Sequence, residues 1–177
     1  SRFFMQALAH DNKNFDILEP FKGIFNQWMV WHENYNYNDK CWSYDLIAKR
    51  IISWLSNHNL SYDGSDQDYK SDFNKIILKQ TNHLVNEVNK SKTLDDKLIC
   101  CASIILVGLC YQEEKKYLSF GISLLKKITK LSLENSGFPK SRNIKQLIFY
   151  LKYFILIREW FKESQNSVPE HVDETIY

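Results

Sequence analysis

The chain contains little glycine or proline, with five Gly and three Pro among 177 residues. This scarcity excludes collagen-like and low-complexity classes, whose composition is dominated by these residues. Strands rich in Val and Thr are hard to find, whereas Leu, Ile and Lys are abundant, which favours an all-α chain. At 44% hydrophobic and 15% aromatic residues, the sequence can bury one sizeable core. We therefore predict one helical domain over residues 1–177.

Motifs for common catalytic and metal chemistry are missing as well. The four cysteines form no CxxC pair and have no metal-type spacing to a histidine, and there is no HExxH motif. A Ser/His/Asp arrangement and a glycine-rich phosphate loop are also absent, and the carboxylates are scattered. We predict no metal site and no cofactor, with Cys100, Cys101 and Cys110 as small apolar core residues.

Charge and hydrophobicity exclude further classes of partner. The formal net charge of +2 is too small to imply nucleic acid, although a basic groove for an acidic ligand stays possible. The apolar run from Leu98 to Tyr111 is too short for a bilayer, which takes about 20 residues. The sequence starts SRFFMQALAH, with no signal-peptide pattern and no initial Met, so we expect a fragment of a longer protein.

Apolar residues at helical spacing predict six or seven helices. The expected helices cover residues 15–32, 44–57, 69–88, 94–109, 113–133 and 146–161, and a seventh begins after Pro169. Ser43 is the expected N-cap of the second, and Thr93 with Asp96 resembles a capping box for the fourth. The segments 98–109 and 146–161 are apolar on most sides, so both should be packed between neighbours.

The stretch ENSGFPKSRNIKQL, residues 134–147, interrupts two apolar helices. A left-handed cap at residues 135–137 is expected to end the helix before it, and Pro139 prevents its continuation. Arg142 and Asn143 then fall on the loop or at the first turn of the next helix, where backbone amides favour an anion. These two residues are therefore candidate ligand contacts, or Arg142 only caps a neighbouring helix.

Two further groups could contact an acidic or sugar ligand. Asn82 and His83 are adjacent and could hydrogen-bond a carboxylate, or His83 could be an ordinary helical residue. Trp42, Arg50 and Trp54 could stack on a sugar ring and hold an acidic group, or the tryptophans could simply pack in the core.

Four segments together resemble the helical N-terminal domain of bacterial heparinase II/III-like proteins. In chain order they are CWSYDLIAKRIISWLSNHNL, FNKIILKQTNHLVNEV, ASIILVGLCY and SGFPKSRNIKQLIFYLKYFILIREW. The resemblance covers roughly residues 40–176 and is carried best by the RIISW block and the SRN loop. It implies an incomplete (α/α) toroid of antiparallel helix pairs, followed in full-length members by a C-terminal β-sandwich region that this sequence lacks.

The family resemblance also implies an activity and residue roles. Its enzymes are polysaccharide lyases that eliminate across uronic acid residues, with Tyr and His as acid and base. Asn82 and His83 match an Asn-His pair that meets the substrate carboxylate, and Arg142 matches an Arg in the family's loop. Gln146 stands where the lyases have their catalytic Tyr, and Tyr150 and Tyr153 lie further along without matching it.

The sequence therefore predicts a domain that binds acidic polysaccharide for elimination by the full-length protein, with catalytic contacts from Asn82 and His83. Arg142, Asn143, Trp42, Arg50 and Trp54 would bind substrate. The expected partners are the polysaccharide and the β-sandwich region, without nucleic acid or membrane. A non-catalytic protein-interaction module and a degenerate lyase are the alternatives, and the isolated chain should be catalytically silent. Localisation is open between the periplasm and the cytoplasm of a bacterium.

Overall fold

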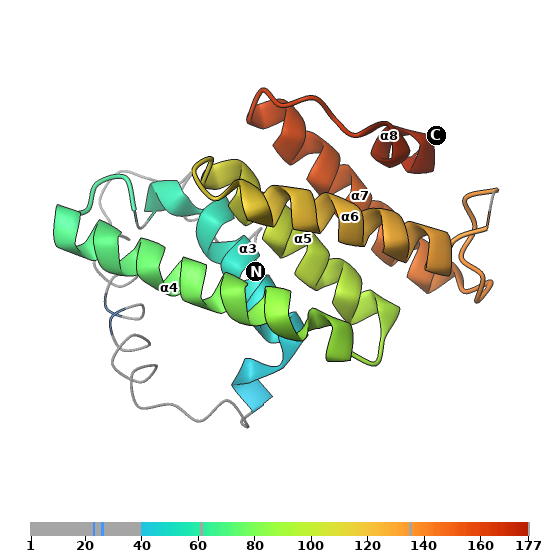
Figure 1. Ribbon diagram of the computed structural model, residues 1–177, viewed down its shortest axis with the longest axis horizontal. Coiled ribbons are helices and arrows are strands. Elements are labelled where there is room, and N and C mark those ends of the chain that lie inside the picture. Colours follow the sequence, from blue (N-terminus) through green and yellow to red (C-terminus); the bar gives the residue numbers. More distant parts are fainter. Residues whose placement is uncertain (1–22, 24–25, 27–39, 61, 135, 177) are drawn as a thin grey trace, which may run out of the picture.

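The computed structural model describes residues 23, 26, 40–60, 62–134 and 136–176 of the chain. Between residues 40 and 176 it contains six α-helices and no strand, labelled as in Figure 1. They are α3 (Tyr44–Ser56), α4 (Gln67–Glu87), α5 (Leu94–Cys110), α6 (Lys115–Ser132), α7 (Ile144–Glu163) and α8 (Glu170–Ile176). The all-α prediction is therefore confirmed for this part of the chain. Apart from residues 23 and 26, the helix predicted over 15–32 lies outside the described residues.

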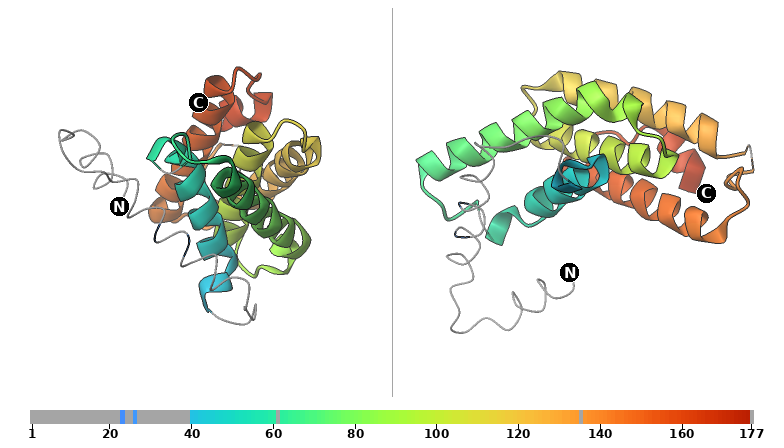
Figure 2. Two further views of the ribbon diagram at one scale, coloured as in Figure 1. Left: turned by 90° about the vertical axis from the view of Figure 1, so that its left-hand side faces the viewer. Right: turned by 90° about the horizontal axis from the view of Figure 1, so that it is seen from below.

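Helix α5 is at the centre of the fold. Every residue from Leu98 to Leu109 is buried, and α5 contacts α3, α4, α6 and α7. Figure 2 shows α4 and α6 on one side of α5, with α3 and α7 on the other. Its buried Ser103 hydroxyl donates to the Cys100 carbonyl at 2.8 Å, so this polar group is satisfied. The expected central position of this helix is confirmed.

Side-chain caps explain where several helices begin. The Thr93 hydroxyl accepts a hydrogen bond from the Asp96 amide at 3.1 Å, which confirms the predicted cap of α5. Ser43 is the N-cap of α3, although its hydroxyl donates to Asp45 instead of capping an amide. Asp66 accepts from the Tyr69 amide at 2.8 Å, so α4 starts two residues earlier than predicted.

Helix α6 runs antiparallel to α5 at very short range. The thiol of Cys101 donates to the Gly121 carbonyl at 3.1 Å. A Cβ atom on Gly108 would lie 2.5 Å from the backbone nitrogen of Leu118, so only glycine fits there. Leu125 and Ile128 of α6 are buried against the core. As predicted, the lysines on the opposite face are exposed, namely Lys115, Lys116, Lys126, Lys127 and Lys130.

One side of α7 is less buried than predicted. Its buried side chains face α5 and α8, but Ile144, Ile148 and Ile155 are 70%, 63% and 46% exposed. Spacings of four and seven residues put these three isoleucines on one face. The expectation that α7 is packed on most sides is therefore wrong for this stripe. Hydrophobic periodicity shows which residues share a face, but it does not show whether a neighbour covers that face.

Two local expectations also need correction. Helix α6 ends at Ser132, and Leu133 is extended and bridged to Pro139, so the left-handed residue Gly137 (φ 78°) belongs to the turn beyond it. Cys100 and Cys101 are buried as predicted, whereas Cys110 is exposed because it is the last residue of α5.

Two kinds of feature are absent from the described residues. No described helix combines the length and hydrophobicity needed to cross a bilayer. No three or more His, Cys, Asp or Glu side chains in the described ranges are arranged to hold a metal ion.

Candidate functional site

The seven residues proposed from the sequence lie in three separate groups. The groups are Trp42, Arg50 and Trp54 on or just before α3, Asn82 and His83 on α4, and Arg142 and Asn143 before α7.

Arg50 lies between two indole rings and ties α3 to its neighbours. Its guanidinium carbon is 5.3 Å from the Trp42 ring centroid and 5.9 Å from that of Trp54. The Arg50 Nε donates to the Gln80 side-chain oxygen at 2.9 Å, and Nη1 donates to the Cys41 carbonyl at 3.2 Å. Burial lowers the pKa of Arg50 to about 10, so it stays charged at neutral pH. These contacts join α3, α4 and the 3-10 helix Lys40–Trp42.

The tryptophans of this group pack largely against core residues. Trp42 is only 4% exposed, and Trp54 is half-buried, with its ring centroid 6.2 Å from that of Phe73. Stacking on a sugar requires an open ring face, which Trp42 does not offer in this conformation. The geometry favours the packing alternative for Trp42 and leaves Trp54 as the more accessible ring.

Asn82 and His83 point to different neighbours. Asn82 is exposed, and its side-chain oxygen accepts a hydrogen bond from the Tyr117 hydroxyl at 2.8 Å. His83 is half-buried, with its ring centroid 6.5 Å from that of Tyr44. The side-chain oxygen of Asn82 thus joins α4 to α6, and its amide nitrogen is the end that could meet a carboxylate.

Histidine protonation should weaken the fold at mildly acidic pH. Burial lowers the pKa of His83 from its usual value of 6.5; Glu87 opposes this effect and Lys90 adds to it. Because the unfolded chain then binds a proton more readily, the free energy of unfolding should fall as the pH drops from 7.5 through about 6.5. Urea unfolding of the wild type and His83→Gln at pH 7.5, 6.5 and 5.5 measures this, and the variant should lose less stability.

His171 provides the matched comparison for that measurement, because burial also lowers its pKa. His171→Gln should reduce the pH dependence in the same direction, and the double variant should reduce it most. Parallel curves for the wild type and the double variant would rule out this explanation of the acid sensitivity.

The loop between α6 and α7 has a backbone fixed by internal hydrogen bonds. The Glu134 amide donates to the Phe138 carbonyl at 2.8 Å, and the Lys140 amide donates to the Ser132 carbonyl at 2.9 Å. The Arg142 amide donates to the Pro139 carbonyl at 2.8 Å. These bonds close the loop just before α7.

The side chains of Arg142 and Asn143 differ in their contacts within the fold. Arg142 has φ 57°, which is uncommon for a residue other than glycine, and its side chain is 72% exposed. Its Nη2 lies 3.1 Å from a carboxylate oxygen of Glu134. The Asn143 side chain accepts a hydrogen bond from the Lys145 amide at 2.9 Å, so it caps α7. Arg142 is therefore the more available of the two.

A cavity of about 410 Å³ lies beside this loop, between the end of α6 and α8. Its charged lining residues are Lys130, Glu134, Lys140 and Glu174. Glu134 also holds Arg142, so the exposed guanidinium lies next to the cavity. Two cations and two carboxylates line it, which suits a ligand that carries both an acidic group and hydroxyls.

The position expected to hold a catalytic phenol holds an amide with two partners. The Gln146 side chain donates to Asp95 at 2.7 Å and accepts a hydrogen bond from the Ser141 hydroxyl, so it links the loop to the first turn of α5. Tyr150 and Tyr153 are only 2% and 6% exposed, and burial raises the pKa of both phenols. Neither tyrosine presents an acid to a ligand on the surface in this conformation.

The structure does not bring Asn82 and Arg142 together. Asn82 contacts Tyr117 in the first turn of α6, whereas Arg142 follows the last turn of that helix. Between Tyr117 and Ser132, α6 rises by about 22 Å. Asn82 and His83 are also not among the residues lining the cavity beside the loop.

Sequence reasoning missed a second cavity, of about 440 Å³, at the other end of α5. Tyr62, Asn74 and Tyr111 contribute its hydroxyl and amide groups, and they come from three distant segments. The available signal was weak: Asn74 is a polar residue directly after the buried Phe73 on α4.

Comparisons with known proteins assign no family. No family model matches the chain, and no solved structure matches it. A leucine–tRNA ligase of Chelativorans sp. (strain BNC1) is similar over 42 residues, at 50% identity. This match covers 24% of the chain and spans 5% of the ligase, so it concerns a short segment of a far longer enzyme.

Proposed function

We propose that this chain is the helical domain of a heparinase II/III-like, polysaccharide lyase-related protein, and that its α6–α7 loop binds carboxylates of an acidic polysaccharide. The observation that carries the proposal is the state of Arg142. This cation is mostly exposed on a hydrogen-bonded loop, beside a cavity that Lys130 and Lys140 help to line. The loop backbone positions the guanidinium, which has five N–H donors and can pair with a ligand carboxylate in addition to Glu134.

The proposed architecture is an incomplete (α/α) toroid. The antiparallel pair α5–α6 supports it, because a toroid is built of such pairs. The Cys101 thiol donates a hydrogen bond to the Gly121 carbonyl near the middle of both helices. The exposed isoleucine stripe on α7 supports it too, since a toroid continues by placing another element against such a face.

In this proposal the chain contributes binding, and the full-length protein completes the elimination. Pairing of Arg142 with a uronate carboxylate would withdraw charge and make the neighbouring C5 proton more acidic. Asn82 and His83 would contact the same polymer several sugars away, because the two groups do not share a cavity. Gln146 carries an amide, and the phenols of Tyr150 and Tyr153 are buried, so we expect the isolated chain to be catalytically silent. A degenerate lyase would show the same lack of an accessible phenol.

Replacing Arg142 with alanine should weaken binding of uronate oligosaccharides about tenfold, which corresponds to about 1.4 kcal/mol. The cause is the loss of a charge-assisted hydrogen bond to the ligand carboxylate. Because the side chain is 72% exposed, the fold should be retained. Titration calorimetry with oligogalacturonate at two salt concentrations measures the effect, and the difference between the proteins should shrink at high salt.

Lys127→Ala is the matched control, since Lys127 is an exposed cation on α6 that does not line the cavity. It should leave the affinity nearly unchanged. Equal binding by the wild type and Arg142→Ala would remove Arg142 from the site.

The exposed stripe of Ile144, Ile148 and Ile155 favours a second candidate, in which α7 docks on a protein domain such as the expected β-sandwich region. Two measurements on the wild type, Arg142→Ala and Ile148→Ser separate the candidates: oligogalacturonate binding by this chain, and association of the domains in the full-length protein. A sugar-binding role predicts sensitivity to Arg142→Ala alone. A docking role predicts that Ile148→Ser alone disrupts the association of the domains.

A further inference from the structure

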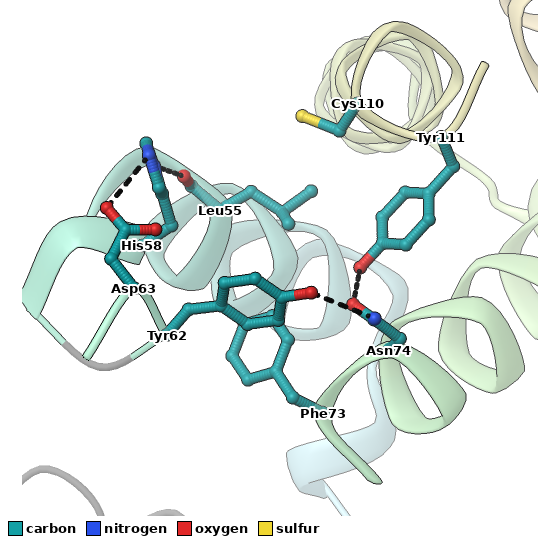
Figure 3. Close-up of a pocket in the computed structure, with 8 residues that line it drawn as sticks. All are labelled: Leu55, His58, Tyr62, Asp63, Phe73, Asn74, Cys110 and Tyr111. Atoms are coloured by element: carbon teal, nitrogen blue, oxygen red, sulfur yellow. Dashed lines mark hydrogen bonds and ion pairs between the residues drawn. The ribbon is translucent and has the colours of Figure 1, made fainter. Parts of the chain in front are cut away.

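The cavity at the C-terminal end of α5 lies between three helical segments (Figure 3). Its volume is about 440 Å³, which is in the range of small-molecule sites. Tyr62, Phe73 and Tyr111 contribute aromatic rings, and Leu55 adds an aliphatic wall. The opposite end of α5 carries Asp95, whose carboxylate bonds to Gln146 below the α6–α7 loop. The two cavities are therefore at opposite ends of the central helix.

Asn74 connects two phenols at the wall of this cavity. Its amide nitrogen donates to the Tyr62 oxygen at 3.1 Å, and its carbonyl accepts from the Tyr111 hydroxyl at 2.7 Å. Figure 3 shows the Tyr62 ring to the left of the amide and the Tyr111 ring above it, with both hydroxyls directed at Asn74. The amide is fixed in one orientation, because the donor and acceptor ends each have a partner.

This trio retains hydrogen-bonding capacity toward a ligand. An amide has two N–H groups and two acceptor positions, and the described contacts of Asn74 use one of each. The Tyr62 oxygen accepts from Asn74, so its own hydrogen can still be donated. The Tyr111 hydroxyl donates to Asn74 and can still accept, and burial raises its pKa, which keeps it protonated. The wall therefore offers donors at its Tyr62 end and acceptors at its Tyr111 end.

The charge of the lining excludes a preference for ions. No Lys or Arg is among the residues that line this cavity. Its charged groups are His58 and Asp63, whose nearest side-chain atoms are 3.7 Å apart, so they partly balance each other when His58 is protonated. A carboxylate ligand would meet the Asp63 carboxylate and no lysine or arginine of the lining, and a hydrocarbon would leave the polar groups of the trio unpaired. The lining thus suits an uncharged molecule with apolar faces and several hydroxyls.

We propose that this cavity binds a neutral pyranose sugar, with the C–H face of the ring against the half-buried Tyr62 and its hydroxyls bonded to Asn74 and Tyr111. The two faces of a pyranose are apolar, while each hydroxyl on its edge can both donate and accept, so adjacent hydroxyls can pair with the donors and the acceptors of this wall. This site is separate from the uronate-binding loop and does not depend on it. The ligand proposed for this cavity is uncharged, whereas the ligand proposed for the loop is an anionic uronate.

The binding experiment uses the full chain and methyl β-D-glucopyranoside as the probe. Saturation-transfer NMR and calorimetry should detect saturable binding, with glucuronate and cyclohexanol both weaker. Asn74→Ala should lower the affinity for the glucoside at least tenfold, whereas Arg142→Ala should not change it. Asn86→Ala is the matched control, because Asn86 is an exposed asparagine on the same helix. Absence of saturable binding, or tighter binding of cyclohexanol, would overturn the proposal.

Cys110 gives a second readout that needs no altered side chain. It lines the cavity, and although the residue is exposed, partial desolvation of its sulfur raises its pKa to about 11, so alkylation should be slow and measurable at pH 9. Saturating glucoside should slow iodoacetamide labelling of Cys110, mapped by mass spectrometry, at least threefold. Labelling of Cys41, which does not line the cavity, should be unchanged. Unprotected Cys110 at a saturating glucoside concentration would place the sugar elsewhere and refute this site.

Discussion

Replacing Gly108 with alanine is expected to lower the free energy of unfolding by about 3 kcal/mol. The added Cβ would lie 2.5 Å from the nitrogen and 2.7 Å from the Cα of Leu118, and both are backbone atoms. Helix α6 would have to move away from α5, which would loosen the contacts of Leu125 and Ile128 with the core. Urea unfolding followed by circular dichroism at 222 nm measures the loss.

Gly121→Ala is the natural comparison for this prediction. Its added Cβ would lie 2.6 Å from Cγ1 of Ile105, a side-chain atom that can shift, and 3.3 Å from the nearest backbone atom. Gly121→Ala should therefore cost less than Gly108→Ala. If Gly108→Ala instead stabilised the protein, as helix propensity alone would predict, the close approach of α5 and α6 would be wrong.

Replacing Phe73 with alanine should cost about 3–5 kcal/mol. Phe73 is 1% exposed, and its ring is surrounded by three others, with centroids 6.2 Å away for Trp54, 5.3 Å for Tyr62 and 6.3 Å for Tyr69. Deleting the ring removes buried apolar area and the ring contacts, and it leaves a cavity that α3 and α4 can fill only in part. The same unfolding measurement applies.

Phe138→Ala is the matched control, because Phe138 is 51% exposed on the α6–α7 loop. It should change the stability by less than about 0.5 kcal/mol. Similar losses for both variants would show that the aromatic cluster around Phe73 is not the buried core that the structure indicates.

Helix positions in the described region were predictable because local signals and apolar faces agree. The cap at Thr93 marks the start of α5, and Pro169 precedes α8. The buried position of α5 followed from its apolar surface on all sides, and the exposure of the α6 lysines followed from their common face.

Features that depend on neighbours were less predictable. Whether Ile148 is covered depends on which element lies beside α7, and its spacing gives no information on that. The end of α6 was predicted to within one residue, but Gly137 was wrongly assigned to its cap, because a glycine signal is equally suited to a turn beyond the helix. The exposure of Ile148 and the role of Gly137 both depend on tertiary contacts.

The candidate site was predictable only in part. The sequence placed Arg142 and Asn143 on the loop or at the first turn of α7. In the structure Arg142 is exposed on the loop and Asn143 caps the helix. The burial of Trp42 and the distance between Asn82 and Arg142 depend on how helices pack, so residue type and spacing could not reveal them. The cavity around Asn74 was missed for the same reason.

The exposed lysines of α6 have a consequence for association kinetics. Lys115, Lys116, Lys126 and Lys127, which do not line the cavity, place positive charge along the helix that leads to the Arg142 loop. Such a field attracts a polyanion before any close contact forms, and it weakens as ionic strength rises. Encounter with an acidic polymer would therefore become slower in salt even for a bound state in which none of these lysines takes part.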